Sequence, residues 1–422
     1  MTIRLLMIAD DFTGALDTGV QLAACGASTR VITGQNVFLK DYQDACEVLV
    51  VDAETRHLTS QEAYDIVYRI VSQALTLGVS YIYKKTDSAL RGNVGAELTA
   101  VLDASGATQL PFLPAFPKIG RNTIAGIHYI GDKPVAESVF GADPFEPVVH
   151  SRVSALIGAQ SNLSVTECKP LKDESSCDVP GILVFDAENQ EQLARTGDVL
   201  LKEGKLTISA GCAGFGSELP RLLKLGTGKP TPVPALDPNF LVICGSVNPI
   251  TIAQADRAEK EGFLRIRLVP EQKLDPEHWI SREGEQEFQI LQDILGRYPC
   301  RIIDTNDGIT NQPTADFAAK HGMTVEDVRQ AVSRSIGYLV SRLFPNPSLG
   351  TLLVTGGDTL LQCMDYMNIH EIEPLCELDH GVVLSRFSYQ GYTRYVISKS
   401  GGFGQEDLFL TLARQIAGKE AL

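Results

Sequence analysis

Short apolar segments alternate with longer amphipathic ones along the first half of the chain. Helical periodicity between the apolar segments predicts helices over Ala15–Cys25, Ser60–Leu77 and Val94–Leu102. We expect Ser60 to cap its helix, with Glu62 in the first turn. Several apolar segments are apolar on both faces, which is typical of strands in a parallel sheet covered by helices. The predicted strands are Arg4–Ile8, Thr29–Thr33, Val48–Val51, Tyr81–Tyr83, Gln109–Leu113, Gly181–Phe185 and Leu206–Ser209.

The alternation stops at a proline-rich stretch. Residues Gly226–Pro238 read GTGKPTPVPALDP, with four prolines in thirteen residues. Proline fixes φ and removes an amide donor, so this stretch can be neither a helix nor a central strand. We therefore expect a linker over 226–238, which separates a domain over residues 1–225 from a second domain over 239–422.

The same alternation returns after the predicted linker. The expected strands are Phe240–Cys244, Leu264–Leu268, Arg301–Asp304, Thr351–Thr355, Val382–Phe387 and Tyr395–Ile397. The expected helices are Ile250–Glu261, Glu285–Leu295, Thr324–Leu343 and Glu406–Ile416. Thr324 should cap its helix, with Asp327 completing a capping box. The whole pattern predicts an α/β protein with two domains, each a mostly parallel sheet flanked by helices.

The composition narrows the classes of function. The chain has 422 residues and a net charge of −15, which argues against binding to nucleic acid or to an anionic membrane. Its nine cysteines include no Cys-x-x-Cys pair, so we expect reduced thiols rather than a zinc or redox site. Neither a signal peptide nor an apolar run of about 18 residues is evident, so a cytoplasmic protein is expected.

Two adjacent carboxylates, Asp10 and Asp11, follow the first predicted strand. Ligands of open parallel sheets bind beyond the carboxyl ends of the strands, so this position favours a functional site. One aspartate could instead cap the following helix. Otherwise, a carboxylate here could hold a substrate hydroxyl or accept its proton. A phosphatase of the haloacid dehalogenase type needs a second aspartate where this chain has Phe12.

The densest polar stretch at a predicted strand end is KKTDSALRGN, over Lys84–Asn93. Together with Arg56, which follows the third strand, Lys85 and Arg91 could clamp a carboxylate or a transferring phosphoryl group. Asp87 could accept a proton from an attacking hydroxyl. The alternative is an ordinary solvated turn, but such a turn needs few directional donors directly after a buried strand.

The segment from Phe116 to Val149 is rich in glycine, proline and polar residues. It is long for an idle connection, so it is either a functional loop or an inserted hairpin. Lys118 and Arg121 could reach the same site as the polar stretch before it. For His128, a lone histidine, a structural role is the more common one.

Three predicted strand ends in the second half carry glycine directly before a helix. They read CGSVNP at 244–249, TGGDT at 355–359 and KSGGFG at 399–404. Glycine lets the backbone approach a phosphate, and a helix N-terminus offers it amide donors. Each stretch alone could be a tight turn, but three together favour a phosphate-binding site. The sequence has no Walker A motif and no G-x-G-x-x-G after a strand, which argues against a P-loop enzyme and a standard dinucleotide fold.

Six motifs together resemble the four-carbon acid sugar kinases, once a domain of unknown function. They are ADDFTGALDTG at 9–19, KKTDSALRGN at 84–93, PAFPKIGR at 114–121, GSVNP at 245–249, TGGDT at 355–359 and SGGFG at 400–404. The resemblance runs the full length of the chain and keeps the order of the family's motifs. It implies an N-terminal substrate domain, a C-terminal nucleotide domain and an active site in the cleft between them. It also implies ATP-dependent phosphorylation of the terminal hydroxyl of a four-carbon sugar acid.

Together with the argument from strand ends, the resemblance gives roles to individual residues. Asp11 and Asp87 are the candidates for the catalytic base, and we favour Asp87 because neighbouring cations would keep it ionised. Mg²⁺ is expected on the ATP phosphates, with its protein ligands left open. The expected substrate-binding residues are Asp10, Asp11, Arg56, Lys85, Thr86, Asp87, Ser88 and Arg91. The expected ATP-binding residues are Ser246, Gly356, Gly357, Asp358, Thr359, Gly401 and Gly402.

The loop FPKIGRNTIAGIHYIGDKPV is more similar to D-threonate kinases than to 3-oxo-tetronate kinases, so conversion of D-threonate to 4-phospho-D-threonate is the expected reaction. D-erythronate and 3-oxo-tetronate stay open as substrates, since one hydrogen bond could switch between stereoisomers. Alternatives of other classes are a non-catalytic sugar-acid sensor and an NAD-dependent oxidoreductase. The expected partners are the sugar acid and ATP, and a homo-oligomer is possible.

Overall fold

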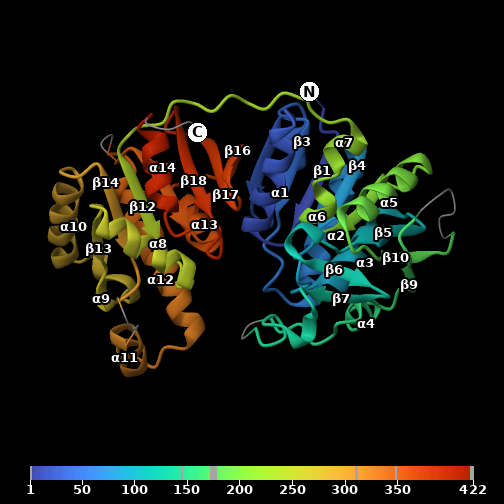
Figure 1. Cartoon of the computed structure of the whole chain (residues 1–422), viewed down its shortest axis with the longest axis horizontal. Coiled ribbons are helices and arrows are strands. Elements are labelled where there is room, and N and C mark those ends of the chain that lie inside the picture. The colour runs from blue at the N-terminus through green and yellow to red at the C-terminus, as the bar shows by residue number, and fades with distance from the viewer. Residues whose placement is uncertain (1, 144–145, 172–177, 309–311, 347–348, 419–422) are drawn as a thin grey trace. The chain divides into compact units, whose positions relative to one another are not determined.

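A computed structural model of the chain describes residues 2–143, 146–171, 178–308, 312–346 and 349–418. The chain divides into two units, Met1–Pro230 and Thr231–Leu422, which are called the N-terminal unit and the C-terminal unit. Each unit has a β-sheet flanked by helices (Figure 1). Residues 226–238 form no helix or strand. Among the described residues, none of the helices has both the length and the apolar composition that a bilayer crossing requires.

The sheet of the N-terminal unit is parallel throughout. Its strands pair in the order β2-β3-β1-β4-β11-β5-β10-β9. They are β1 (Leu5–Ala9), β2 (Thr29–Thr33), β3 (Val48–Asp52), β4 (Tyr81–Lys85), β5 (Gln109–Leu113), β9 (Val165–Cys168), β10 (Gly181–Phe185) and β11 (Ile208–Gly211). The prediction of a parallel sheet is confirmed, and β4 extends two residues beyond the predicted strand.

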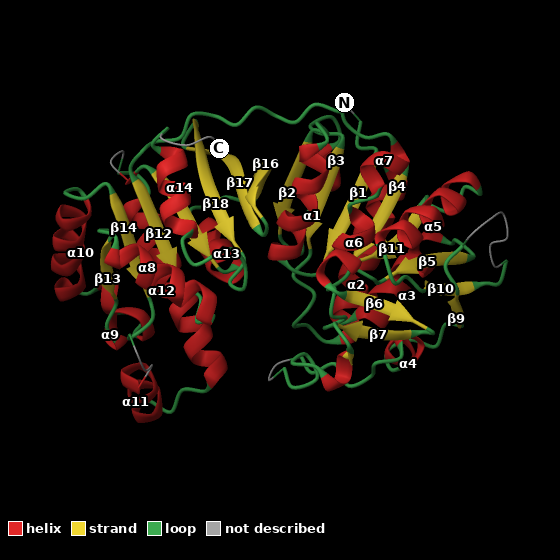
Figure 2. Cartoon of the chain, viewed as in Figure 1, coloured by secondary structure: helices red, strands yellow, loops and turns green. Residues whose placement is uncertain are grey.

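Helices cover both faces of this sheet (Figure 2). They are α1 (Phe12–Ala24), α2 (Ser60–Thr76), α3 (Val94–Ser105), α4 (Val153–Gly158), α5 (Gln190–Lys202), α6 (Ala213–Gly216) and α7 (Leu219–Leu223). Helices α2 and α3 pack against each other, and Val67 and Leu98 join Ile8 and Val51 of the sheet in one buried core. Burial of such side chains removes apolar surface from water, which is the main force that holds the sheet and helices together.

The N-cap of α2 differs from the prediction. Thr59, not Ser60, caps the helix, because its backbone is extended and its hydroxyl accepts from the amide of Glu62. The Glu62 carboxylate reaches back to the amide of Thr59 at 3.0 Å and completes a capping box. Ser60 lies inside the helix and donates to Asn93 Oδ1 at 2.9 Å.

The Phe116–Val149 segment contains the inserted hairpin that was one of its two predicted forms. Strands β6 (Arg121–Ile124), β7 (Ile127–Ile130) and β8 (Lys133–Pro134) form a small antiparallel sheet. Short 3₁₀ helices flank it at Pro117–Ile119 and Val135–Glu137, and another lies at Leu39–Tyr42. Residues 144–145 of the segment lie outside the described residues.

The C-terminal unit has a mixed sheet. Strands β13-β14-β12-β15-β18 are parallel in that order, and β17 and β16 then continue antiparallel. The strands are β12 (Phe240–Cys244), β13 (Leu264–Arg267), β14 (Cys300–Asp304), β15 (Thr351–Thr355), β16 (Glu371–Asp379), β17 (Val382–Tyr389) and β18 (Tyr392–Lys399). The sequence did not predict β16, because Pro374 argues against a strand. The pairing of β16 with β17 shifts register directly after Pro374, which accommodates the proline.

In the C-terminal unit, helix α8 packs against α14, α12 packs against α13 and α9, and α9 also packs against α11. The helices are α8 (Pro249–Lys260), α9 (Pro270–Leu274), α10 (Arg282–Leu295), α11 (Gln312–Lys320), α12 (Val325–Leu343), α13 (Gly357–Tyr366) and α14 (Leu408–Ile416), with a 3₁₀ helix at His278–Ile280. Thr324 caps α12 and forms the predicted capping box with Asp327. The prediction of two α/β domains with mostly parallel sheets is confirmed.

Candidate active site

The register of three central strands brings the predicted polar residues of the N-terminal unit to one edge of the sheet. Ala9, the last residue of β1, is paired with Asp52 of β3 and with Lys85 of β4. Residues that follow these strands therefore lie next to one another. They form a charged cluster, a name used here for Asp10, Asp11, Arg56, Lys85, Thr86, Asp87, Ser88 and Arg91.

Arg56 lies at the centre of the charged cluster. Its Nε donates to Asp10 Oδ2 at 2.9 Å, and its Nη2 lies 2.8 Å from the same oxygen and 2.7 Å from Asp11 Oδ1. Asp87 Oδ1 is 3.8 Å from Nη2. Burial disfavours the guanidinium, but the three carboxylates outweigh it and hold the pKa of Arg56 well above its usual value. The pKa of Asp10 is lowered, since Arg56 and Lys85 outweigh the effect of its burial.

Asp11 combines the two roles that the sequence left as alternatives. Its Oδ1 caps α1 by accepting from the amide of Gly14 at 3.2 Å. The same oxygen accepts from Lys85 Nζ at 3.4 Å, and Lys85 also lies 3.6 Å from Asp10 Oδ1. A Cβ at Gly14 would collide with Lys85 Nζ, so glycine at this position makes room for the ammonium group.

The two lysines at the end of β4 point in opposite directions. The sequence placed Lys84 and Lys85 after the strand, but they are its last two residues, and successive strand residues face opposite sides of a sheet. Lys84 Nζ lies 3.0 Å from Glu97 Oε2 on α3 and donates to the carbonyl of Lys85 at 2.8 Å. Glu97 also accepts from the hydroxyl of Thr55. Lys84 is therefore part of the framework under the charged cluster.

Asp87 is held by four hydrogen bonds. Arg91 donates to it through Nε at 2.9 Å and Nη2 at 3.1 Å, and the amides of Ala89 and Arg91 donate at 3.2 and 3.3 Å. Burial would raise its pKa, but Arg56 and Arg91 lower the pKa of Asp87 well below its usual value. The carboxylate is ionised, as expected, but it is a weak base. The Asp11 side chain is more exposed, at 23% against 8% for Asp87.

The inserted hairpin contacts the charged cluster at Ser88. His128 is buried, its Nε2 donates to the carbonyl of Ser88 at 2.9 Å, and its Nδ1 accepts from the Thr123 hydroxyl at 3.0 Å. Burial lowers the pKa of His128 to about 4, so the ring is neutral at pH 7 and its role here is structural. Arg121, the first residue of β6, donates through Nη1 to Ser88 Oγ.

Some buried oxygens of the charged cluster have no hydrogen-bond donor within the described part of the chain. Thr86 is fully buried, and its Oγ1 has no hydrogen-bond partner there. The same holds for Asp10 Oδ1, whose neighbour is the ammonium of Lys85. Buried polar atoms are nearly always satisfied by protein, water or a ligand. A ligand with several hydroxyl groups could provide the missing donors.

The glycine-bearing strand ends of the C-terminal unit also meet. Gly245 follows β12, and its amide donates to Thr355 Oγ1 of β15 at 3.1 Å. A Cβ at Gly245 would collide with the hydroxyl of Thr359 in the first turn of α13. Gly356 has φ +92°, a conformation that glycine adopts without strain. These residues, with Ser246, Gly357, Gly401 and Gly402, are called the glycine site.

The third strand end approaches the glycine site through Ser246. A Cβ on Gly401 would lie 2.6 Å from Ser246 Oγ. The carbonyl of Gly401 accepts from Thr251 Oγ1 at 2.7 Å. Lys399 Nζ lies beneath this loop and donates to Thr251 Oγ1 at 3.0 Å and to the carbonyls of Ser400 and Gly401 at 3.1 and 3.2 Å. Burial lowers the pKa of Lys399 to about 8.

The predicted ATP ligand Asp358 has a different neighbour. Its carboxylate forms an ion pair with Arg329 of α12, and the side chain is 61% exposed. Asn306, which follows β14, was not among the predicted ATP-binding residues. Its Nδ2 donates to the carbonyl of Ser246 at 3.2 Å, and its Oδ1 is buried without a hydrogen-bond partner among the described residues. The polar run DTND at 304–307, directly after a buried strand, was the signal that could have identified it.

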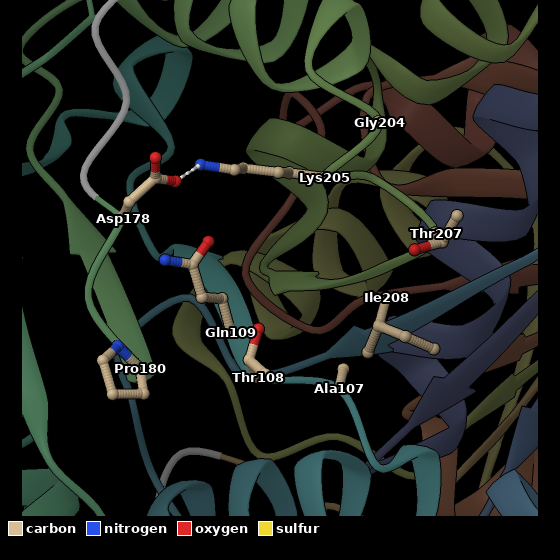
Figure 3. Close-up of a pocket in the computed structure, with 9 residues that line it drawn as sticks. All are labelled: Ala107, Thr108, Gln109, Asp178, Pro180, Gly204, Lys205, Thr207 and Ile208. Carbon is tan, nitrogen blue, oxygen red and sulfur yellow. Dashed lines mark hydrogen bonds and ion pairs between the residues drawn. The ribbon is translucent and has the colours of Figure 1, made fainter.

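A cavity of about 670 Å³ lies in the N-terminal unit, and none of its lining residues belongs to the charged cluster (Figure 3). Its lining includes residues next to the amino ends of β5, β10 and β11, whereas the charged cluster follows the carboxyl ends of strands. Lys205 points toward Asp178 across it, at 2.7 Å. The lining is Ala107, Thr108, Gln109, Asp178, Pro180, Gly204, Lys205, Thr207 and Ile208. Its position makes it a poor candidate for the active site of this fold.

One α/β unit has a buried network of cations and carboxylates, which is typical of a site for a polar small molecule. The other unit has a glycine-rich site, which is typical of nucleotide binding. Together they indicate an enzyme that uses both. Comparison with known proteins agrees with this. A family model described as a sugar-binding N-terminal domain matches residues 5–219, and one described as a nucleotide-binding C-terminal domain matches residues 241–409.

The chain belongs to the four-carbon acid sugar kinase family. It is 28% identical to a D-threonate kinase of Salmonella typhimurium over 421 residues, covering 96% of each chain. It is 34% identical to a D-erythronate kinase of Heliobacterium modesticaldum, covering 97% of this chain and 96% of the relative. A crystal structure from Salmonella typhimurium, 21% identical, has the same fold with a TM-score of 0.80 and covers 97% of this chain and 99% of its own. The predictions of this family and of a kinase are confirmed.

Proposed function

We propose that the chain transfers the γ-phosphoryl group of ATP to the terminal hydroxyl of a four-carbon sugar acid, with D-threonate as acceptor and 4-phospho-D-threonate as product. The observation that carries the proposal is the charged cluster around Arg56, which offers both cations and carboxylates at a strand end. A sugar acid presents one carboxylate and several hydroxyls, so it needs both kinds of partner. The glycine site supplies backbone and hydroxyl groups for a triphosphate.

The residues of this chain have a small number of tasks in such a reaction. Phosphoryl transfer depends mostly on positioning and on charge stabilisation, so an ionised carboxylate of low basicity is sufficient to accept the hydroxyl proton. As the new oxygen–phosphorus bond forms, the acceptor hydroxyl gives its proton to Asp11 or Asp87, and ADP leaves with the bridging oxygen. Asp87 is fixed by Arg91, whereas Asp11 is the more exposed of the two. Both stay candidates for the base.

The proposal includes ATP at the glycine site and Mg²⁺ with it. Close approach of Gly245 and Gly401 to their neighbours leaves no room for a Cβ, which suits a backbone that contacts phosphates. Mg²⁺ would neutralise charge on the phosphates, and it is commonly held by these phosphates, water and one or two carboxylates. Transfer also requires that acid and nucleotide meet. The expected cleft between the domains, the cytoplasmic location and a homo-oligomer stay predictions.

The choice of acid rests on the relatives. One relative is named a D-threonate kinase and another a D-erythronate kinase, and the second has the higher identity. D-Erythronate is therefore the second acceptor to test. The two acids differ at one stereocentre, so a single hydrogen bond in the charged cluster would distinguish them.

A panel assay tests the proposal. The purified chain is given ATP, Mg²⁺ and D-threonate, D-erythronate or 3-oxo-tetronate, and ADP formation is followed. We expect D-threonate to give the highest kcat/KM, with phosphorus NMR placing the new phosphate on the terminal oxygen. If no acid stimulates ADP formation, the kinase proposal fails. Calorimetry with ATP then separates a sugar-acid sensor, which should bind no nucleotide, from an enzyme with another acceptor.

A further inference from the structure

The cations around the charged cluster differ in whether a carboxylate already neutralises them. Arg56 and Lys85 lie against Asp10 and Asp11, and Arg91 forms ion pairs with two further aspartates. Arg121 is different. Within the described residues it forms no ion pair with a carboxylate, and its guanidinium donates to the hydroxyl of Ser88.

The surroundings of Arg121 hold its guanidinium in place. Its backbone pairs with Phe116, whose amide donates to the carbonyl of Arg121 at 2.6 Å and whose carbonyl accepts from the amide of Arg121 at 3.1 Å. The guanidinium carbon lies 5.0 Å from the centre of the Phe140 ring, and that of Arg91 lies 5.2 Å from the same ring. A ring shared by two guanidiniums fixes both planes and leaves their edges available for hydrogen bonds.

An unneutralised and partly buried guanidinium is unfavourable by itself. Burial lowers the pKa of Arg121 from its usual value, and the charge of Asp87 compensates only in part. The guanidinium has five N–H donors, and one of them is used by Ser88. A ligand carboxylate would provide both the missing charge and the missing acceptors, in the planar geometry that arginine binds best.

We propose that Arg121 and the Ser88 hydroxyl bind the carboxylate of the sugar acid, and that Arg121 selects acids over uncharged sugars. This inference rests on the proposed function and refines it. Arg56 and Lys85, which were predicted together with Arg91 to clamp a carboxylate or a phosphoryl group, then act mainly to hold Asp10 and Asp11 in place for the substrate hydroxyls. His128 acts as a positioning residue, because it fixes the Ser88 backbone.

Binding measurements without ATP test this inference separately from turnover. The affinities of D-threonate and of its uncharged amide, D-threonamide, are measured by calorimetry for the wild type and for Arg121→Gln. A hydrogen-bonded charge pair contributes about 1.5–3 kcal/mol, so Arg121→Gln should weaken D-threonate binding by about 10- to 100-fold. Binding of the amide should change by less than about threefold. The preference of the wild type for the acid should therefore disappear.

Two further variants make the outcome decisive. Arg152→Gln is the matched control, because Arg152 pairs with Glu167 at the surface, outside the charged cluster, and should not alter either affinity. Arg121→Lys keeps the charge but not the fork, so it should recover part of the acid preference, and it serves if the glutamine variant does not fold.

Equal weakening of acid and amide by Arg121→Gln would mean that Arg121 only supports Ser88, and unchanged acid affinity would place the carboxylate elsewhere. Either result overturns the inference about Arg121. The proposed function is judged separately, by whether four-carbon acids stimulate ADP formation by the wild type. A wild type that binds no four-carbon acid refutes both.

Discussion

The charged cluster and the glycine site are built from different interactions. In the charged cluster, side chains such as Arg56 and Asp87 fix one another through ion pairs. In the glycine site, Gly245 and Gly401 let backbone and neighbouring side chains approach closely. A site built from paired charges should therefore fail when one charge is removed. A site built from close approach should fail when a methyl group is added.

Two buried lysines, one near each site, also differ in whether a carboxylate is paired with them. Lys84, under the charged cluster, is paired with Glu97, and both side chains are almost completely buried. Lys399, under the glycine site, is 1% exposed and forms no ion pair among the described residues; its neighbours are neutral oxygens. A charge that is buried among neutral groups is costly unless an anion arrives. This difference suits a framework in the first case and an anion-binding loop in the second.

The largest expected effect is loss of turnover on removal of a carboxylate charge. Asp87→Asn keeps the shape of the side chain but cannot accept a proton, so kcat should fall by about 10²- to 10⁴-fold if Asp87 is the base. Steady-state kinetics with D-threonate measure this, with Asp11→Asn assayed in parallel. Asp178→Asn, at an 87% exposed side chain far from strand carboxyl ends, is the control. A larger loss in Asp11→Asn would identify Asp11 as the base.

The two buried lysines should differ in what their removal does to stability. Lys84→Met leaves Glu97 buried without its cation and should lower the free energy of unfolding of the N-terminal unit by about 3–5 kcal/mol. Lys399→Met leaves neutral acceptors unpaired and should cost about 1–3 kcal/mol. Trp279, the single tryptophan of the chain, lies in the C-terminal unit, so its fluorescence in urea reports on that unit, and far-UV circular dichroism reports on both.

The contrast between the lysines is contradicted if Lys84→Met is tolerated as well as Lys399→Met. The double variant Lys84→Met/Glu97→Gln provides a check. Removal of both partners should recover most of the stability lost in the single variant, because no unpaired charge is then buried. If the double variant is no more stable than the single one, the loss arises from packing rather than from charge.

The fold was predictable because several of its strands are apolar on both faces and are followed by helical periodicity. The errors have local causes. Lys84 and Lys85 were placed after the strand, since nothing in the local pattern shows that Glu97 is there to receive a buried ammonium. Strand β16 was missed because of its internal proline, and Ser60 was chosen as a cap although Thr59 has the correct spacing to Glu62.

For the candidate site, the sequence was enough to predict which residues lie together in the N-terminal unit, but not how their charges are paired. Parallel strands place their carboxyl ends together, so polar residues after β1, β3 and β4 had to meet. The sequence cannot tell which cations are already neutralised, because that depends on contacts between distant segments, such as Arg91 with Asp143 and Arg121 with Ser88. Lys399 and Asn306 were not assigned roles, because their contacts with the loops that contain Gly401 and Ser246 do not appear in the local sequence.

In the glycine site, an added methyl group should weaken ATP binding. In the charged cluster, by contrast, the damaging change is removal of a charge. Gly245→Ala would place a Cβ against Thr359, 3.1 Å from its Cγ2 as well as in collision with its hydroxyl. Relief of about 1–3 kcal/mol of strain should displace the first turn of α13 and raise the Kd for ATP by roughly tenfold. Gly296→Ala, whose Cβ would be 3.5 Å from Gln292 O at a φ of −66°, is the control. An unchanged Kd in Gly245→Ala would remove α13 from the nucleotide site.

The smallest expected effect is a dependence of ATP binding on pH. It should arise from Lys399 in the C-terminal unit and not from the charged cluster. Lys399 has a pKa of about 8, so near this pH the side chain is neutral in part of the molecules. Bound phosphates favour the charged form of Lys399 and raise its pKa, so ATP should bind with uptake of part of a proton near pH 8. The affinity for ATP should therefore fall by less than about tenfold per pH unit as the pH rises through 8. Calorimetry in buffers of different ionisation enthalpy measures the uptake. Lys399→Met should abolish it, and the same uptake in that variant would assign the proton to another group and leave Lys399 a structural residue.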